Sequence, residues 1–206
     1  MTQHFQDLVF TPQVKQIQQE QGSRNAYARL EGHSTATDAL TDREAEFIAT
    51  RDSFYMATVS ETGWPYVQHR GGPAGFLKVI DASTIGFADY RGNRQYVSVG
   101  NLHNDDRVAL FLMDYPHQRR LKLLGHARTV DTGTEPELLA KLQDDYAARA
   151  ERGIIIKVEG YDWNCPQHIT PRFTEAELLE ILRPVQARIA ALEQENAVLR
   201  RQIGAA

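Results

Sequence analysis

Short strand-like segments separated by turns constrain the fold of this chain most, and they are densest between residues 53 and 102. Residues 53–60 and 65–69 alternate in polarity around the turn SETGWP, in which Gly63 supplies a positive φ. Further strands are predicted at residues 76–80, 84–88, 107–114, 119–130 and 152–163. Antiparallel strands at such short spacing favour a small β-barrel over an α/β sheet. We therefore expect a mainly β fold with flanking helices.

Capping patterns and composition divide the chain into three expected parts. Thr41 followed by Glu44 forms a capping box for a helix over residues 41–49, and a second helix is predicted over residues 135–150. The first forty residues are polar and rich in glutamine. We expect an N-terminal arm at residues 1–40, a barrel domain at residues 41–172 and a C-terminal helix at residues 173–206.

Charge and cysteine content limit the partners of the protein. A net charge of −4 over 206 residues argues against a general nucleic-acid binder, whose surface should be basic. The lone Cys165 cannot form an intrachain disulfide, and no apolar run approaches the roughly 18 residues that a membrane span needs. There is also no apolar N-terminal segment of the signal-peptide type. We expect a soluble, cytoplasmic protein that binds neither nucleic acid nor membrane.

The sequence RGNRQ, at residues 91–95, follows a predicted strand and leads into a predicted helix. Arginine side chains and the free N–H groups of a helix start both favour oxyanions, so this junction suits a phosphate. Arg70 and Lys78 also lie at strand ends, and nearby glycines let a ligand approach the backbone. Solvated surface charge is the alternative for Arg70, Lys78, Arg91 and Arg94.

Residues 47–130 resemble the FMN-binding split barrels of the pyridoxamine 5′-phosphate oxidase family. They are most similar to members of undefined activity that carry the pattern RGG…GNR…S…NL, which Arg70, Asn93, Arg94, Ser98 and Asn101 match. The resemblance implies an FMN-binding split β-barrel that forms a homodimer with the flavin at the dimer interface.

The resemblance also implies which side chains hold the flavin phosphate. In the oxidase a lysine ends one strand, and a Ser-Arg-Lys cluster follows the next strand. Lys78 takes the first position, and Asn93, Arg94 and Gln95 take the second, so only the central arginine of the cluster is kept.

A later strand is expected to reach the flavin of the partner chain. RRLKLLG, at residues 119–125, stands where the oxidase has RQVRIEG. Arg120 replaces the glutamine that contacts the flavin, and Lys122 replaces the second arginine. The alternative is that Arg120 and Lys122, two residues apart, are exposed charges on the solvent face of a half-buried strand.

The expected function is a flavin-dependent oxidoreductase that acts on an unidentified small molecule. The oxidase binds the phosphate of its vitamin B6 substrate through an RLH-type motif, and this chain has PRF near residue 172 instead. Vitamin B6 oxidation is therefore not expected, and no catalytic acid or base can be assigned. The alternatives are a flavin carrier or sensor without turnover, and a split barrel that binds haem or a deazaflavin.

Residues 162–173, DWNCPQHITPRF, raise two further possibilities. Cys165 and His168 are three residues apart, but two ligands without a second pair fall short of a zinc pattern, so no metal is predicted. A cap over the flavin ring is the other interpretation, because C-terminal segments of other split barrels have that role.

The C-terminal segment has a heptad pattern. Leu182, Ile189, Asn196 and Ile203 occupy the a positions, and Val185, Leu192 and Leu199 occupy the d positions. An asparagine at a, with Arg188 and Glu193 and then Glu195 and Arg200 at g and e, favours a parallel dimeric coiled coil. Pro184 is expected to separate this zipper from the helix that begins after Thr174. A single amphipathic helix packed on its own domain is the alternative.

Overall fold

The computed structural model describes residues 3–31, 37–131, 133–163 and 166–204. The chain divides into two compact units. The first comprises Met1–Asp114 and Arg119–Gln167, and the second comprises Tyr115–Gln118 and His168–Ala206.

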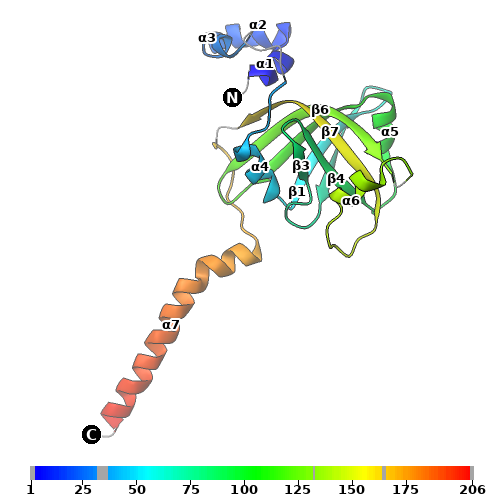
Figure 1. Cartoon of the computed structure of the whole chain (residues 1–206). Helices are drawn as coiled ribbons and strands as arrows, with labels where there is room; N and C mark the ends of the chain where they lie inside the picture. Colours follow the sequence, from blue (N-terminus) through cyan, green and yellow to red (C-terminus); the bar gives the residue numbers. More distant parts are fainter. Residues whose placement is uncertain (1–2, 32–36, 132, 164–165, 205–206) are drawn as a thin grey trace. The chain divides into compact units, whose positions relative to one another are not determined.

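A single antiparallel sheet of seven strands carries the first unit (Figure 1). Its strands are β1 (Ser53–Val59), β2 (Pro65–Gly71), β3 (Lys78–Asp81), β4 (Thr84–Tyr90), β5 (Arg107–Asp114), β6 (Arg119–Val130) and β7 (Ala150–Trp163). They lie in the order β2-β1-β5-β6-β7-β4-β3. The helices of this unit are α1 (Gln3–Val9), α2 (Pro12–Glu20), α3 (Arg24–Tyr27), η1 (Ala28–Leu30), α4 (Asp42–Ala49), α5 (Val97–Asn104) and α6 (Pro136–Leu142). The predicted mainly β fold with flanking helices is confirmed.

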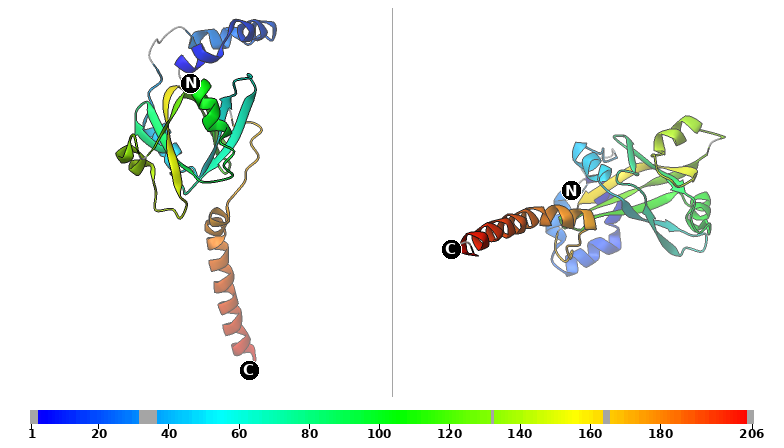
Figure 2. Two further views of the ribbon diagram at one scale, coloured as in Figure 1. Left: turned by 90° about the vertical axis from the view of Figure 1, so that its right-hand side faces the viewer. Right: turned by 90° about the horizontal axis from the view of Figure 1, so that it is seen from below.

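The sheet curls until its two ends approach each other across the core (Figure 2). Four strands separate β2 from β4 in the sheet, yet Arg70 of β2 and Asp89 of β4 form an ion pair of 2.6 Å. The rings of Phe54 on β1 and Phe87 on β4 likewise have centroids 5.2 Å apart. Among the described strands no ladder joins β2 to β3, so the barrel stays open along that side. This arrangement is a split barrel.

Alternating burial along the strands fills the barrel. Every second residue of β5 points into the core, including Leu110 and Leu112. β7 departs from alternation, because Ile154, Ile155 and Ile156 are all buried. Ile155 packs with Leu142 of α6 on the outer face, so α6 covers that part of the sheet.

The capping box that begins α4 is confirmed and reaches further than the helix. The Glu44 carboxylate accepts hydrogen bonds from the backbone N–H and the hydroxyl of Thr41. It also accepts from Trp163 Nε1 at 2.6 Å and from the Tyr161 hydroxyl at 3.2 Å. Glu44 therefore ties α4 to the end of β7.

The N-terminal segment is attached to β7 through its backbone. The Asp38 carboxylate accepts hydrogen bonds from the N–H of Phe5 at 3.0 Å and of Tyr161 at 3.4 Å. A Cβ added to Gly160 would lie 2.9 Å from the backbone of Phe5, so glycine is needed where α1 crosses the strand.

Several predicted boundaries of the first unit are wrong. β2 and β4 each extend two residues further than predicted, and β7 begins two residues earlier. The strand expected from Phe76 begins at Lys78, because the Phe76 N–H bonds to the Pro73 carbonyl in a turn. The helix expected over residues 135–150 ends at Leu142. Beyond that point the Tyr146 ring packs on Tyr90 with centroids 5.1 Å apart, a long-range contact that overrides local helix propensity.

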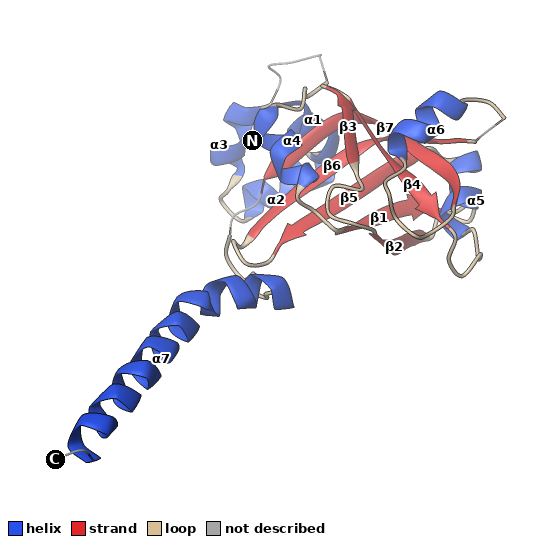
Figure 3. Ribbon diagram, turned by 60° about the horizontal axis from the view of Figure 1, so that its bottom comes forward, coloured by secondary structure: helices blue, strands red, loops and turns tan. Residues whose placement is uncertain are grey.

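The second unit is dominated by α7 (Glu175–Gly204), one continuous helix (Figure 3). Its predicted start is confirmed, since Thr174 and Glu177 exchange capping hydrogen bonds of 2.7 and 3.3 Å. The predicted separation at Pro184 is wrong, because Pro184 lies inside the helix. A proline within a helix removes one hydrogen bond and bends the axis; Figure 1 shows α7 bending in its N-terminal third. No helix in the described part of the chain is long and apolar enough to cross a membrane.

Candidate functional site

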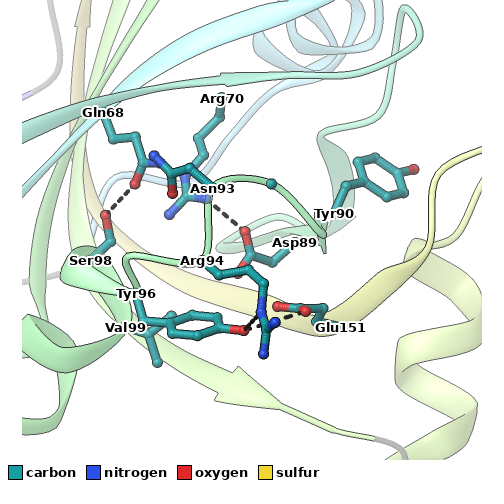
Figure 4. A pocket seen from close by; sticks show the side chains of 11 residues that line it. Gln68, Arg70, Asp89, Tyr90, Asn93, Arg94, Tyr96, Ser98, Val99 and Glu151 are labelled. Atoms are coloured by element: carbon teal, nitrogen blue, oxygen red, sulfur yellow. Dashed lines mark hydrogen bonds and ion pairs between the residues drawn. The ribbon is translucent and has the colours of Figure 1, made fainter.

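A polar pocket of about 160 Å³ lies where β2, β4 and the start of α5 meet. Its lining residues, drawn in Figure 4, are Gln68, Arg70, Asp89, Tyr90, Gly92, Asn93, Arg94, Tyr96, Ser98, Val99 and Glu151. The curl of the sheet forms the pocket, because it brings the ends of β2 and β4 together. The predicted strand-to-helix junction supplies the rest of the wall.

Arg70 and Asp89 form the buried side of the pocket. Arg70 donates a hydrogen bond of 2.6 Å to Asp89, and the side chains are 12% and 10% exposed. Among the described residues, Arg70 Nε is buried without a hydrogen-bond partner. Burial raises the pKa of Asp89, and the neighbouring guanidinium groups of Arg70 and Arg152 only partly offset this effect. The pocket thus combines a buried guanidinium that has spare donor capacity with a carboxyl group that resists ionisation.

The loop after β4 forms the exposed side of the pocket. Arg94 and Tyr96 have φ values of 60° and 53°, in the left-handed region that non-glycine residues seldom adopt. Arg94 Nε donates to the Tyr96 hydroxyl at 3.1 Å, and that hydroxyl donates to Glu151 of β7 at 3.4 Å. The strained loop therefore places the Arg94 side chain in the lining of the pocket, beside Tyr96 and Glu151 (Figure 4).

α5 is fixed to the barrel through two polar contacts. Ser98 Oγ donates to Gln68 Oε1 at 3.0 Å at the pocket wall. Asn101 Nδ2 donates to Thr58 Oγ1 at 2.9 Å, away from the pocket lining. Ser98 therefore lines the pocket and also fixes α5, whereas Asn101 fixes α5 away from the pocket.

Four of the residues predicted for cofactor binding lie together in this pocket: Arg70, Asn93, Arg94 and Ser98. Three others lie outside its lining. Lys78 forms an ion pair with Asp144, beyond α6. Gln95 is exposed on the same loop as Arg94, and its N–H bonds to Asn93 Oδ1 at 3.2 Å.

Arg120 and Lys122 lie elsewhere, on the outer face of β6. Arg120 stands 5.6 Å from the centroid of the Phe111 ring. Lys122 forms an ion pair of 2.6 Å with Asp162 on β7. An outward position on the sheet is compatible with contacts to a second chain, which is the role predicted for Arg120.

Sequence reasoning missed the acidic residues of the pocket and Gln68. Gln68 lies two positions before Arg70, so strand alternation places both side chains on one face of β2. The alternation of this strand therefore predicts Gln68 beside Arg70. Asp89 and Glu151 come together only through the pairing of β4 with β7. No local pattern indicates that pairing.

The segment at residues 162–173 is only partly described. Cys165 lies outside the described residues, and the expected cap over a flavin stays a prediction. Trp163 packs on Phe47 with ring centroids 4.8 Å apart and donates to Glu44. Trp163 is therefore a core contact of α4.

Comparison with known proteins identifies the family. Residues 40–164, more than half of the chain, match the family model described as pyridoxamine 5′-phosphate oxidase. No curated protein matches the sequence. Similar solved structures include HupZ of Group A Streptococcus, with 16% identity over 65% of this chain and 99% of that chain and a TM-score of 0.49. General stress protein 26 of Bacillus anthracis has 14% identity over 63% and 92% of the two chains and a TM-score of 0.45. An FMN-binding protein of Syntrophomonas wolfei has 12% identity over 71% and 97% and a TM-score of 0.46.

The match extends from just before α4 to the end of β7 and so contains the whole sheet and the polar pocket. Because it spans most of the first unit, the chain belongs to the pyridoxamine 5′-phosphate oxidase family of split barrels.

Proposed function

We propose that the protein binds FMN, with the phosphate in the pocket between Arg70 and Arg94, and acts as a flavin-dependent oxidoreductase on a small molecule. The observation that carries the proposal is that two arginine side chains, Arg70 from β2 and Arg94 from the loop after β4, line one polar cavity together with Asn93. Guanidinium groups form charge-assisted hydrogen bonds with phosphate oxygens, so two of them at one cavity favour a phosphate as its occupant.

The donor set of the pocket fits a phosphate. Arg70 and Arg94 provide guanidinium groups, and Asn93 provides an amide. Ser98 would have to turn its single O–H away from Gln68 to donate to the phosphate. An ionised Asp89 carboxylate would repel a phosphate, but its raised pKa and its ion pair with Arg70 reduce that repulsion. Bound FMN would supply hydride acceptance, and the chain would supply its position and surroundings.

We also propose that the functional form is a homodimer with the flavin at its interface. The outer face of β1, β2, β5 and β6 has an apolar groove of about 380 Å³, lined in part by Tyr55, Val67 and Phe111. Val67 is 60% exposed and Tyr55 41%. Arg120 lies on the same face, beside Phe111. A second copy that covers this groove would therefore contact Arg120.

The test is the absorbance spectrum of the purified full chain, followed by titration with FMN and with riboflavin. We expect a flavin spectrum and an affinity for FMN at least tenfold above that for riboflavin, because riboflavin lacks the phosphate. A Soret band would indicate haem and overturn the proposal, as would equal affinity for the two flavins. Reduction by a nicotinamide cofactor followed by reoxidation separates an enzyme from a carrier.

The substrate is expected to differ from that of the oxidase itself. Because the RLH-type motif is missing, the FMN-loaded protein should not oxidise pyridoxine or pyridoxamine 5′-phosphate. Formation of pyridoxal 5′-phosphate at about 1 per second or faster would contradict this expectation.

A further inference from the structure

α7 carries an apolar seam along its whole length. The seam repeats with alternating spacings of three and four residues and consists of Leu178, Leu182, Val185, Ile189, Leu192, Asn196, Leu199 and Ile203. Each apolar side chain of the seam is at least 39% exposed. Since burying one such side chain contributes about 1.5–3 kcal/mol, seven of them favour a partner for this face.

We propose that the occupant of the seam is α7 of a second copy, paired in parallel and in register as a two-stranded coiled coil. A spacing that averages three and a half residues keeps the seam on one side of a left-handed supercoil. The helix of 30 residues is about 45 Å long, enough for four heptads. This inference is independent of the flavin site.

The charges beside the seam fit a second copy of the same helix. In a parallel pair Arg188 at g faces Glu193 at e of the second copy, and Glu195 at g faces Arg200 at e. Twofold symmetry makes each ion pair occur twice. No like charges meet across the seam at these positions.

These charges do not by themselves fix the orientation. An antiparallel register that sets residue 189 against residue 199 of the second copy also pairs Glu193 with Arg200 and Arg188 with Glu195. The two orientations differ at Asn196. The antiparallel register buries its amide against Leu192, whereas the parallel register sets amide against amide, where they can exchange hydrogen bonds.

A disulfide across the seam distinguishes the orientations. The lone Cys165 is first replaced, as Cys165→Ser, and Leu199→Cys is then introduced in the full chain. In a parallel pair the two introduced sulfurs at position 199 lie opposite each other, whereas the antiparallel register separates them by about ten residues of helix, roughly 15 Å. The matched control is Arg201→Cys, at the f position that faces away from the seam.

We expect the Leu199→Cys chain to form covalent dimers on mild oxidation at least tenfold faster than the Arg201→Cys chain, measured on non-reducing gels. Similar rates for the two positions, or no dimer through position 199, would overturn the proposal. Circular dichroism verifies that both variants keep the helix.

Charge reversal tests the partner. Arg188→Glu should raise the dissociation constant of the dimer, and the double variant Arg188→Glu with Glu193→Arg should restore it, as measured by sedimentation. Asn196→Leu in the Leu199→Cys chain should tighten the dimer but lower the yield of the disulfide, because the antiparallel register becomes accessible. An unchanged dissociation constant in Arg188→Glu would contradict pairing between copies of α7.

Discussion

Arg94 combines a strained backbone with a predicted ligand contact. If its guanidinium binds the FMN phosphate, Arg94→Ala should weaken FMN binding by about 1.5–3 kcal/mol, the scale of one charge-assisted hydrogen bond. Fluorescence titration measures the loss, and riboflavin binding should change little. Arg107→Ala is the control, because Arg107 is exposed and pairs with Asp105. Equal losses for both flavins would contradict the phosphate contact.

Arg94→Gly should separate stability from binding. Relief of the left-handed conformation, worth about 1–2 kcal/mol, exceeds the entropic cost of glycine, about 0.5–1 kcal/mol. We expect the free energy of unfolding of the unliganded protein to rise by about 0.5 kcal/mol while FMN affinity falls as in Arg94→Ala. Urea unfolding of the two variants provides the comparison. A Gly variant less stable than the Ala variant would show that φ of 60° costs nothing at this position.

Glu44 links α4 to β7 through one carboxylate. Glu44→Ala leaves the Trp163 Nε1–H, the Tyr161 hydroxyl and the Thr41 N–H without their acceptor, so the free energy of unfolding should fall by about 3 kcal/mol. Glu46→Ala, on the exposed side of the same helix, should change it by less than about 0.5 kcal/mol. Urea unfolding at neutral pH measures both.

The same carboxylate gives stability a pH dependence. Burial raises the pKa of Glu44, but the hydrogen bonds from Thr41, Trp163 and Tyr161 outweigh burial and lower it. The stabilisation is therefore fully present above the unfolded pKa of about 4.3 and is lost as pH falls through the folded value. Glu44→Ala should lose less stability than the parent between about pH 5 and pH 3. If the free energy of unfolding falls equally with pH in the parent and in Glu44→Ala over that range, Glu44 is not the source of the pH dependence.

At the scale of elements, the sequence predicts those whose signal is local. The capping residues of α4 and α7 and the alternation of β1, β5 and β6 are all visible in short windows. The second half of the helix expected over residues 135–150 fails because Asp144 and Tyr146 are held by Lys78 and Tyr90, which lie far away in the sequence. The candidate site divides in the same way: its basic loop is a contiguous motif, whereas Asp89 and Glu151 depend on strand pairing.

The junction of β6 and β7 contains a register shift between Leu124 and Gly125. A Cβ at Gly125 would lie 2.3 Å from the Lys157 carbonyl oxygen, which is backbone and cannot move aside without breaking the ladder. Gly125→Ala should therefore destabilise the protein by about 3 kcal/mol or more.

The matched control is Gly100→Ala within α5. No atom lies within 4 Å of an added Cβ there. Alanine should raise stability by up to about 1 kcal/mol through helix propensity. If both variants lose similar stability by thermal unfolding, close approach at Gly125 is not the cause.

For the whole molecule, the proposed barrel dimer and the proposed coiled coil should reinforce each other. Deleting residues 186–206 should leave a dimer that still binds FMN but dissociates at a higher protein concentration, because the tail raises the effective concentration of the barrel contacts. Sedimentation with and without FMN measures the change. A truncated chain that stays monomeric when saturated with flavin would show that the coiled coil alone forms the dimer.

The strand order also determines how long a strand waits for its neighbour during translation. β4 is complete at Tyr90, but its neighbour β7 ends at Trp163, 73 residues later. At about 5–20 residues per second, translation leaves β4 without that neighbour for about 4–15 seconds. Ile85 and Phe87 of β4, which are buried in the folded barrel, are exposed during that interval. A ribosome-bound nascent chain is therefore open to chaperones and to aggregation at β4 until β7 emerges.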